Sequence, residues 1–191
     1  MKFCSDCGSE VEFKIPDDDN RPRYVCTSCK TIHYQNPNIV AGTLPIYENK
    51  ILLCKRAIEP RYGYWTLPAG FMENQETTVE AASRETLEEA DAQVQNLRLY
   101  TVISVPQIDQ VHIYFLADLV DGKFGVGPES LECQLFAEEN IPWDDISFPT
   151  VKKTLKLYLK DKQRGQFDTH VTDIIREPRE VSFPVYKFKA S

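Results

Sequence analysis

The stretch from Gly70 to Glu89, GFMENQETTVEAASRETLEE, decides how the rest of the chain is interpreted. Its second half predicts a helix over about 77–90. On a helix, residues three and four apart share a face, so Glu85, Glu88 and Glu89 place three carboxylates within one turn. The opposite side is predicted to carry an apolar stripe that packs on the protein. Its members are Val79, Ala82, Thr86, Leu87 and Ala90.

The carboxylate face admits two interpretations. Clustered carboxylates repel one another, and a hard divalent cation such as Mg²⁺ relieves that repulsion because it prefers oxygen ligands. The alternative is an ordinary acidic face in contact with water, which is common on surface helices. By spacing alone, the solvated face is the more common outcome.

The residues before the helix change this balance. The pattern Gly-x5-Glu-x7-Arg-Glu-x2-Glu-Glu is present in full between Gly70 and Glu89, and six fixed residues at fixed spacing are a specific signal. The chain here resembles the Nudix hydrolases, whose motif this is. The segments Leu52–Arg56 and Trp65–Gly70 are similar to the strand that precedes the motif and to its entry loop.

Two positions depart from the family pattern. Asp91 stands where a helix-ending Gly is usual, and Asp tolerates the left-handed conformation better than most residues do. Thr86 replaces an aliphatic residue on the side expected to be buried. Neither change removes an expected metal ligand.

The resemblance implies hydrolysis of a nucleoside diphosphate linked to another group. It implies that Glu85, Glu88 and Glu89 bind Mg²⁺ or Mn²⁺, and that the carbonyl of Gly70 is an additional candidate ligand. Glu76 would be a further ligand or a partner of Arg84. The expected fold is an α/β/α sandwich built on a mixed sheet, which the alternating order of strands and helices also favours.

A general base must take a proton from the attacking water. One of the motif glutamates is a candidate, and so are Glu129 and Glu132 in the loop that begins at Gly127. Ordinary surface acids are an equally good interpretation of these two residues. Three residues are candidates for substrate contacts or for purely structural roles: Arg56 for a phosphate, and Tyr64 or Phe71 for stacking on a ring.

Two Cys-x2-Cys pairs near the start predict a structural zinc site. Cys4 and Cys7 are separated from Cys26 and Cys29 by 18 residues, a spacing typical of Cys4 zinc ribbons. Disulfides are disfavoured because the start of the chain lacks the apolar core of a signal peptide. The remaining pair, Cys54 and Cys133, is expected in the apolar core.

A zinc ribbon ahead of a Nudix domain narrows the resemblance. The NADH pyrophosphatases carry a Ser-Gln-Pro-Trp-Pro-Phe-Pro element that Ile103–Gln110 does not match. The plant plastid FAD pyrophosphatases are more similar, which implies conversion of FAD to FMN and AMP, with NADH and ADP-ribose as alternatives. The segments that carry this similarity are Tyr34–Pro37, Leu52–Arg56, Trp65–Gly70 and Gly127–Cys133.

The chain is expected to contain a ribbon at 1–35, a Nudix domain at 36–164 and a tail at 165–191. The tail is expected to be either loose or an arm that docks on a partner. Many members of the family complete their site across a dimer, which implies a homodimer here.

The chain's balance of charge and its hydropathy bear on its partners. The net charge of −7, with 29 acidic and 22 basic residues, argues against binding to nucleic acid. The sequence contains no stretch of about 18 apolar residues, so no membrane-spanning helix is predicted. A cytoplasmic location is therefore expected. Two rival functions remain open: a nucleotide-sensing regulator without catalysis, and an enzyme that acts on RNA ends.

Overall fold

The computed structural model describes residues 1–175, and the chain divides into two units, Met1–Pro37 and Asn38–Ser191. The first unit contains an antiparallel sheet of three short strands: β1 (Val11–Lys14), β2 (Arg23–Cys26) and β3 (Ile32–His33). Its buried hydrophobic side chains are Cys4, Val25 and Cys26. So little apolar burial cannot by itself stabilise a module of this size.

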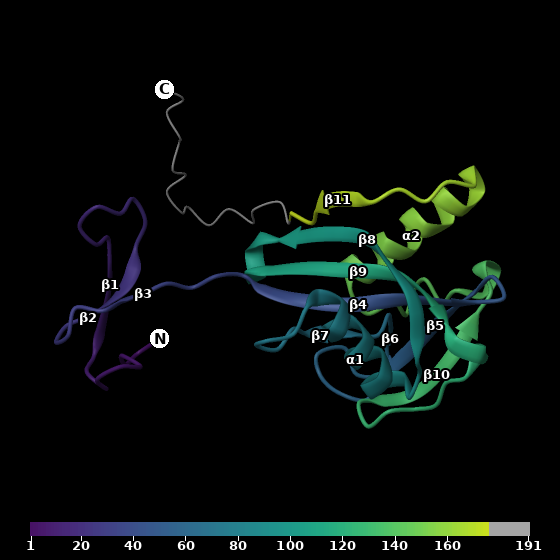
Figure 1. Ribbon diagram of the computed structural model, residues 1–191, viewed down its shortest axis with the longest axis horizontal. Coiled ribbons are helices and arrows are strands. Elements are labelled where there is room, and N and C mark those ends of the chain that lie inside the picture. Colours follow the sequence, from purple (N-terminus) through teal and green to yellow (C-terminus); the bar gives the residue numbers. More distant parts are fainter. Residues whose placement is uncertain (176–191) are drawn as a thin grey trace. The chain divides into compact units, whose positions relative to one another are not determined.

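The second unit is built on one sheet of eight strands (Figure 1). They are β4 (Asn38–Tyr47), β5 (Lys50–Arg56), β6 (Trp65–Thr66), β7 (Ala69–Phe71), β8 (Val94–Val105), β9 (Gln110–Leu119), β10 (Ser130–Phe136) and β11 (His170–Asp173). The order along the sheet is β10-β5-β4-β9-β8-β11, while β6 pairs with β5 and β7 with β4. The pairs β4–β9 and β8–β11 are parallel and the others antiparallel, so the predicted mixed sheet is confirmed.

The two α-helices of the described residues are α1 (Thr78–Ala90) and α2 (Pro149–Arg164), and neither is long and apolar enough to cross a membrane. Short 3₁₀ helices occur at η1 (Pro106–Ile108), η2 (Val120–Gly122) and η3 (Glu138–Asn140). Helix α1 begins and ends within about one residue of the range 77–90 that the sequence predicts.

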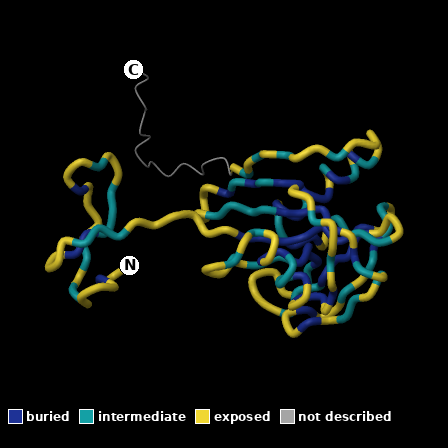
Figure 2. The backbone as a smooth tube through the Cα atoms, in the orientation of Figure 1, coloured by how far each residue is buried: buried dark blue, intermediate teal, exposed yellow. Residues whose placement is uncertain are grey.

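The helices cover opposite faces of the sheet. Neighbouring residues of a strand point to opposite faces, so each strand contributes side chains to the core under both helices. The face under α2 buries the larger cluster, which includes Leu44, Leu53, Tyr100, Tyr114, Val151, Leu155 and Tyr158. The face under α1 buries a smaller one, made of Ala41, Ala81, Ala82 and Phe115. Figure 2 shows the buried residues concentrated in the strands and on the inner sides of the helices. The expected α/β/α sandwich is confirmed.

Helix α1 is well defined at both ends. Thr77 is its N-cap and forms a capping box with Glu80, which satisfies backbone N–H groups of the first turn. At the other end Asp91 adopts the left-handed conformation, with φ 45° and ψ 43°, and its N–H donates to the Leu87 carbonyl at 2.9 Å. Asp91 thus takes the conformation for which the family uses glycine.

The predicted apolar stripe of α1 is partly wrong. Val79 and Leu87 are 42% and 48% exposed, whereas the buried side consists of Ala81, Ala82, Thr86, Glu89 and Ala90. Small side chains let the helix lie close to the sheet, and the two larger apolar residues fall on its outer side. The buried side therefore includes one of the glutamates expected on the opposite face.

The sequence predicts a loose tail or an arm after Gly165. Its first part instead returns to the sheet, where β11 pairs in parallel with β8 and Ile174 N–H donates to the Ser104 carbonyl at 2.9 Å. The rest of this expectation concerns residues 176–191, which lie outside the described residues.

Candidate active site

Arg84 lies at the centre of the carboxylates on α1. Its Nη1 donates to Glu85 at 2.7 Å and to Glu88 at 2.9 Å, and its Nε and Nη2 contact both oxygens of Glu76. Nη2 also donates to the Phe71 carbonyl at 3.2 Å. One guanidinium therefore joins the entry loop to the helix and offsets the repulsion between the acids.

Glu89 differs from its neighbours because it is buried. It is 6% exposed, and its Oε2 is buried without a hydrogen-bond partner among the described residues. Burial raises the pKa of Glu89 to about 8, and the negative charge of Glu85 contributes in the same direction. The cation of Arg56 and the amide of Ala69 act in the opposite direction. An unpartnered carboxylate oxygen in such a place is costly unless a cation or donor meets it.

Glu85 is held between helix and loop. Its side chain is 12% exposed, and burial is the main cause that raises its pKa. A Cβ placed on Gly70 would overlap the Glu85 carboxylate. Glycine at position 70 therefore lets the loop backbone lie directly against this carboxylate. By contrast, the Glu88 side chain is 55% exposed.

The loop before β10 packs against the end of α1. The N–H of Gly125 donates to the Ala90 carbonyl at 2.6 Å, and that of Gly127 donates to the Glu89 carbonyl at 3.0 Å. A Cβ on Gly127 would overlap the Glu88 carbonyl oxygen, so the close approach requires glycine. These contacts satisfy carbonyls that the helix end would otherwise leave open.

The two candidate bases lie in different elements, because Glu129 belongs to this loop whereas Glu132, expected in the loop, lies in β10. Glu129 is exposed and lies two residues after Gly127, which contacts α1, and its negative charge contributes to the raised pKa values of Glu85 and Glu89. Glu132 is paired across the strands with Lys55, whose Nζ lies 3.7 Å from its carboxylate. Glu129 therefore lies in the loop that contacts α1, whereas Glu132 is directed to Lys55 within the sheet.

The three candidate substrate contacts lie in different settings. Arg56 lies near Glu89, donates to the Pro60 carbonyl at 2.9 Å and has its guanidinium 5.1 Å from the centre of the Phe148 ring. Tyr64 carries the Arg61 guanidinium over its ring at 5.4 Å. Phe71 is 56% exposed at the end of β7. Of the three, Arg56 is the residue whose charge acts on a motif glutamate, because it lowers the pKa of Glu89.

The donor set on α1 suits a hard divalent cation. Carboxylate oxygens from Glu85, Glu88 and Glu89 are the ligands that Mg²⁺ and Mn²⁺ prefer, and the buried oxygen of Glu89 lacks any other partner in the described structure. The carboxylates are spread around Arg84 rather than gathered within 4.8 Å of one another, in contrast to the four cysteines.

The four N-terminal cysteines form a closed set. The Sγ atoms of Cys4, Cys7, Cys26 and Cys29 all lie within 4.8 Å of one another, with Cys4–Cys29 at 3.7 Å and Cys7–Cys26 at 3.4 Å. Tetrahedral zinc with Zn–S bonds of about 2.3 Å requires sulfur atoms about 3.8 Å apart, so these residues fit the ion. His33 Nε2 lies 3.2 Å from the Cys4 sulfur and can orient it.

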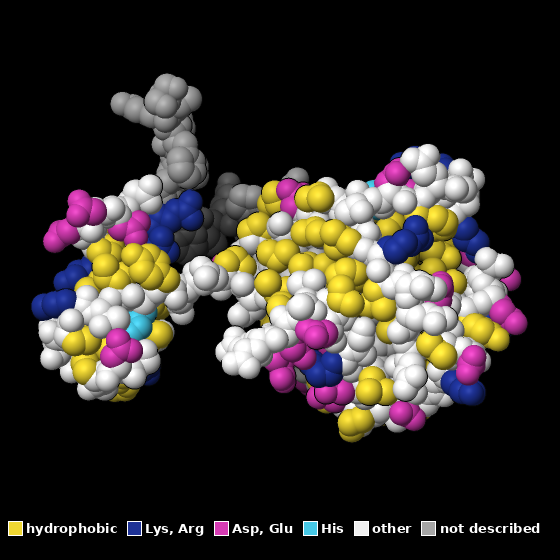
Figure 3. Space-filling view, in the orientation of Figure 1, with side chains coloured by type: hydrophobic (Ala, Val, Ile, Leu, Met, Phe, Trp, Pro, Cys, Tyr) yellow, Lys and Arg dark blue, Asp and Glu magenta, His cyan; other side chains and the backbone are white. Residues whose placement is uncertain are grey.

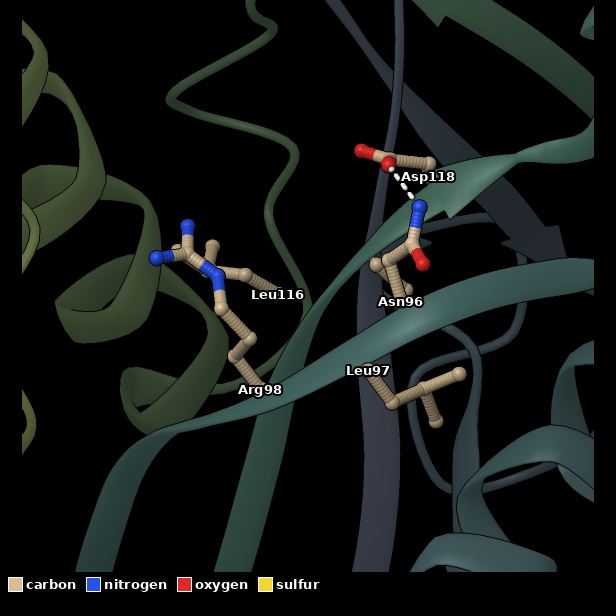
Figure 4. Close-up of a pocket in the computed structure, with 6 residues that line it drawn as sticks. Asn96, Leu97, Arg98, Leu116 and Asp118 are labelled. Atoms are coloured by element: carbon tan, nitrogen blue, oxygen red, sulfur yellow. Dashed lines mark hydrogen bonds between the residues drawn. The ribbon is translucent and has the colours of Figure 1, made fainter.

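A separate surface pocket of about 500 Å³ lies where β8 and β9 change register (Figure 4). It is lined by Asn96, Leu97, Arg98, Leu116, Ala117 and Asp118. Asn96 donates to Asp118 at 2.9 Å, while Arg98 points to another side of the strand. None of the predicted site residues lines this pocket.

Some residues that shape the site have no recognisable signal in the sequence. Thr43 on β4 lies 2.6 Å from the Thr86 hydroxyl, which in turn donates to the Ala82 carbonyl at 2.7 Å. This buried pair explains why threonine is accepted at position 86, because both hydroxyls have partners. The close contact of the loop with α1 could have been inferred from the glycines at 125 and 127.

Both units match known families. Residues 2–35 match the model described as "Nudix N-terminal", a zinc ribbon, and residues 37–157 match the NUDIX domain. The two modules together define a class of protein in which a zinc ribbon precedes an α/β domain with an acidic helix. The chain belongs to the Nudix hydrolase family.

Several known proteins are similar to this chain. An ADP-ribose pyrophosphatase of Methanocaldococcus jannaschii is 34% identical over 57% of this chain and 67% of its own length. An NAD-capped RNA hydrolase NudC of Salmonella heidelberg is 29% identical over 74% of this chain and 53% of its own. The chain therefore spans about half the length of the NudC relatives. The crystal structure of a NUDIX hydrolase from Nitrosomonas europaea is 55% identical, with a TM-score of 0.88, and covers 91% of this chain and 99% of that one.

Proposed function

We propose that this chain hydrolyses the pyrophosphate bond of a dinucleotide in a magnesium-dependent reaction, with FAD converted to FMN and AMP. The observation that supports metal-dependent hydrolysis is the buried carboxylate of Glu89. Its Oε2 lacks a hydrogen-bond partner among the described residues, and it lies on the same helix as Glu85, which packs against Gly70 of the entry loop. The preference for FAD rests on the sequence segments that are similar to the plant plastid enzymes.

The proposed roles follow from where each group lies. Glu85, Glu88 and Glu89 would hold Mg²⁺ or Mn²⁺, with Gly70 at the edge of the set. When bound, the ion neutralises charge on the pyrophosphate and lowers the pKa of a water. Arg84 keeps Glu76, Glu85 and Glu88 in place through its hydrogen bonds.

Two further residues would act on the substrate and the water. Arg56, next to Glu89, would meet a phosphate oxygen of the substrate. Glu129 is the proposed general base because it is exposed on a loop next to the cluster, where it can accept the proton of the attacking water. The overall reaction consumes one water and leaves one phosphate on each product.

The alternative substrates share an ADP group with FAD. ADP-ribose and NADH differ from it only in the distal group, and relatives of this chain are named as an ADP-ribose pyrophosphatase and NAD-capped RNA hydrolases. A regulator that senses nucleotides without catalysis is the alternative from another class. Retention of every motif carboxylate argues against it.

The substrate proposal predicts the outcome of a product analysis. The purified full chain with Mg²⁺ is expected to release FMN and AMP from FAD faster than it hydrolyses NADH, ADP-ribose, a diadenosine polyphosphate or NAD-capped RNA. Chromatography of the products measures each rate. Faster cleavage of another compound would overturn the FAD assignment alone, whereas no cleavage of any of them would overturn the hydrolase proposal and favour the regulator.

We also propose a homodimer formed through the α1 side of the sheet. Leu99 and Val171 are 44% and 79% exposed, and their strand register places them on the side of Phe115 and α1. Figure 3 shows hydrophobic side chains gathered over β8 and β9, next to the acidic residues of α1. Exposed apolar surface of this kind is typical of protein interfaces.

The dimer proposal predicts a particle of twice the 22.0 kDa chain mass in light scattering. The double substitution Leu99→Lys and Val171→Lys is expected to shift it to a monomer, because two charges on each copy would be desolvated in the interface. Ile58→Lys is the control, since Ile58 is 39% exposed just after β5, which lies towards the other end of the sheet from β8 and β11. A wild-type monomer, or a double variant that stays dimeric, would contradict the proposal.

A further inference from the structure

Cys54 and Cys133 are directly opposite each other in the antiparallel pair of β5 and β10. Both side chains belong to one apolar cluster on the α1 side of the sheet, together with Leu52, Leu135 and Ala90. Cys54 is 1% exposed, whereas Cys133 is partly accessible. Two thiols therefore face each other in the apolar cluster that also contains Ala90, the last residue of α1.

The geometry is close to that of a disulfide. Residues directly opposite in an antiparallel pair have Cβ atoms about 4.5–5.5 Å apart, and a disulfide requires about 3.5–4.5 Å. The bond therefore requires the two strands to approach by roughly 1 Å at this pair. Strand β10 can make that approach, because it forms an edge of the sheet and has an irregular register between Ser130 and Glu132.

Movement of β10 would change the surroundings of Glu89 and of the loop that carries Glu129. The Cys133 thiol donates to the Glu89 carbonyl at 3.5 Å, a contact that the sulfur loses when it bonds to Cys54. The loop with Gly127 and Glu129 leads straight into β10, and Gly127 N–H binds the same Glu89 carbonyl. A disulfide at this pair would therefore disturb Glu89 and the proposed base together.

We propose that Cys54 and Cys133 are a redox modification site, at which a peroxide forms a reversible disulfide that lowers the activity of the enzyme. The effect on activity rests on the hydrolytic function proposed above, whereas formation of the bond does not.

The chemistry requires two steps. The accessible Cys133 sulfur attacks one peroxide oxygen, which breaks the O–O bond and gives a sulfenic acid and water. The Cys54 sulfur then attacks the Cys133 sulfur and displaces a second water, while a thiol reductant reverses the bond. The two thiols are oxidised and one peroxide is reduced to two waters.

The test uses the zinc-loaded full chain. After brief exposure to hydrogen peroxide and alkylation, peptide mass spectrometry is expected to find Cys54 linked to Cys133, with the link lost after dithiothreitol. Turnover of the substrate that the product analysis identifies is expected to fall at least tenfold and to recover with the reductant. A colorimetric zinc assay on the same sample separates this event from oxidation of the ribbon cysteines.

Two variants make the result specific. Cys133→Ser keeps a hydroxyl donor for the Glu89 carbonyl and is expected to retain turnover in peroxide, and Cys54→Ala is expected to do the same. Full alkylation of both cysteines after peroxide would overturn the proposed site. A mapped disulfide without loss of turnover would overturn its inhibitory role, and absence of turnover before oxidation would instead refute the proposed function.

Discussion

Replacing Glu89 by Gln is expected to lower turnover by about 10²–10⁴-fold, because the charge stabilisation that a bound metal supplies in the transition state is worth several kcal/mol. The same variant is expected to stabilise the metal-free protein at pH 8. The two effects have opposite signs because the buried carboxylate is costly until it meets a cation. Thermal unfolding with and without Mg²⁺, together with steady-state kinetics, measures both.

The pH dependence follows from the raised pKa of Glu89. The folded chain holds this proton up to about pH 8, whereas an unfolded glutamate releases it near its ordinary pKa of 4.5. Between these values the folded state binds more protons than the unfolded state, so stability of the metal-free protein falls as pH rises from about 4.5 to 8. The cost reaches a few kcal/mol, because a tenfold difference in proton affinity between the folded and unfolded states corresponds to about 1.4 kcal/mol.

Gln at position 89 is neutral and removes this dependence. Mg²⁺ is expected to raise the melting temperature of the wild type more at pH 8 than at pH 6, and to have little effect on Glu89→Gln. Glu88→Gln is the matched control for metal-free stability, because the Glu88 side chain is 55% exposed. Near-normal turnover of Glu89→Gln would refute the proposed role of this residue.

Replacing Cys26 by Ser is expected to release the zinc ion and to unfold residues 1–37. Structural zinc contributes about 10–16 kcal/mol of apparent binding free energy at such sites, more than a module of this size gains from its core. Two of the three buried hydrophobic side chains of this unit, Cys4 and Cys26, are themselves proposed ligands. Loss of the ion therefore removes the main source of order.

Zinc content by mass spectrometry and limited proteolysis of the N-terminal unit test this expectation. Ser28→Ala serves as the control, since it changes a residue of the same knuckle that is not a ligand. The second unit has its own core and is expected to keep its melting transition. A Cys26→Ser chain that retains one zinc and resists the protease would contradict a structural role for the ion.

The longer strands and the helices could be predicted because turn residues and hydrophobic periodicity are local features of the sequence. The tight turn between β4 and β5 is an example, since Glu48 and Asn49 take the positive φ values of 46° and 62° that such hairpins require. Strands β6 and β7 could not be predicted in the same way. Two or three residues are too few to show alternation, and these strands exist because β5 and β4 offer them free edges.

The candidate site could be predicted only in part. The spacing of the motif brings Glu85, Glu88 and Glu89 to one region, but it says nothing about how deeply each carboxylate lies. Burial of Glu89 depends on alanines 81, 82 and 90, which let α1 lie close to the sheet. Helical periodicity assigned the larger Val79 and Leu87 to the buried side, and tertiary packing reversed that choice.

The loop acids illustrate a second limit. Glu129 and Glu132 are three residues apart, and sequence gives no reason to prefer one of them. Their separation arises because Glu132 already lies in β10, where the pleat and the pairing with Lys55 fix its direction, whereas Glu129 lies in the loop that contacts α1. The pairing of Cys54 with Cys133 likewise depends on strand register, which composition cannot supply.

The ends of the sheet also limit how copies of the chain can associate. In the described residues the outermost strands are β10, with an irregular register, and β11, whose four residues pair with Thr101–Ser104 of the twelve-residue β8. Short or irregular margins are poor templates for strand addition, which is how native sheets resist growing into fibrils. The return of the chain at His170–Asp173 therefore covers Thr101–Ser104 of β8 and shortens the strand edge that another copy could extend.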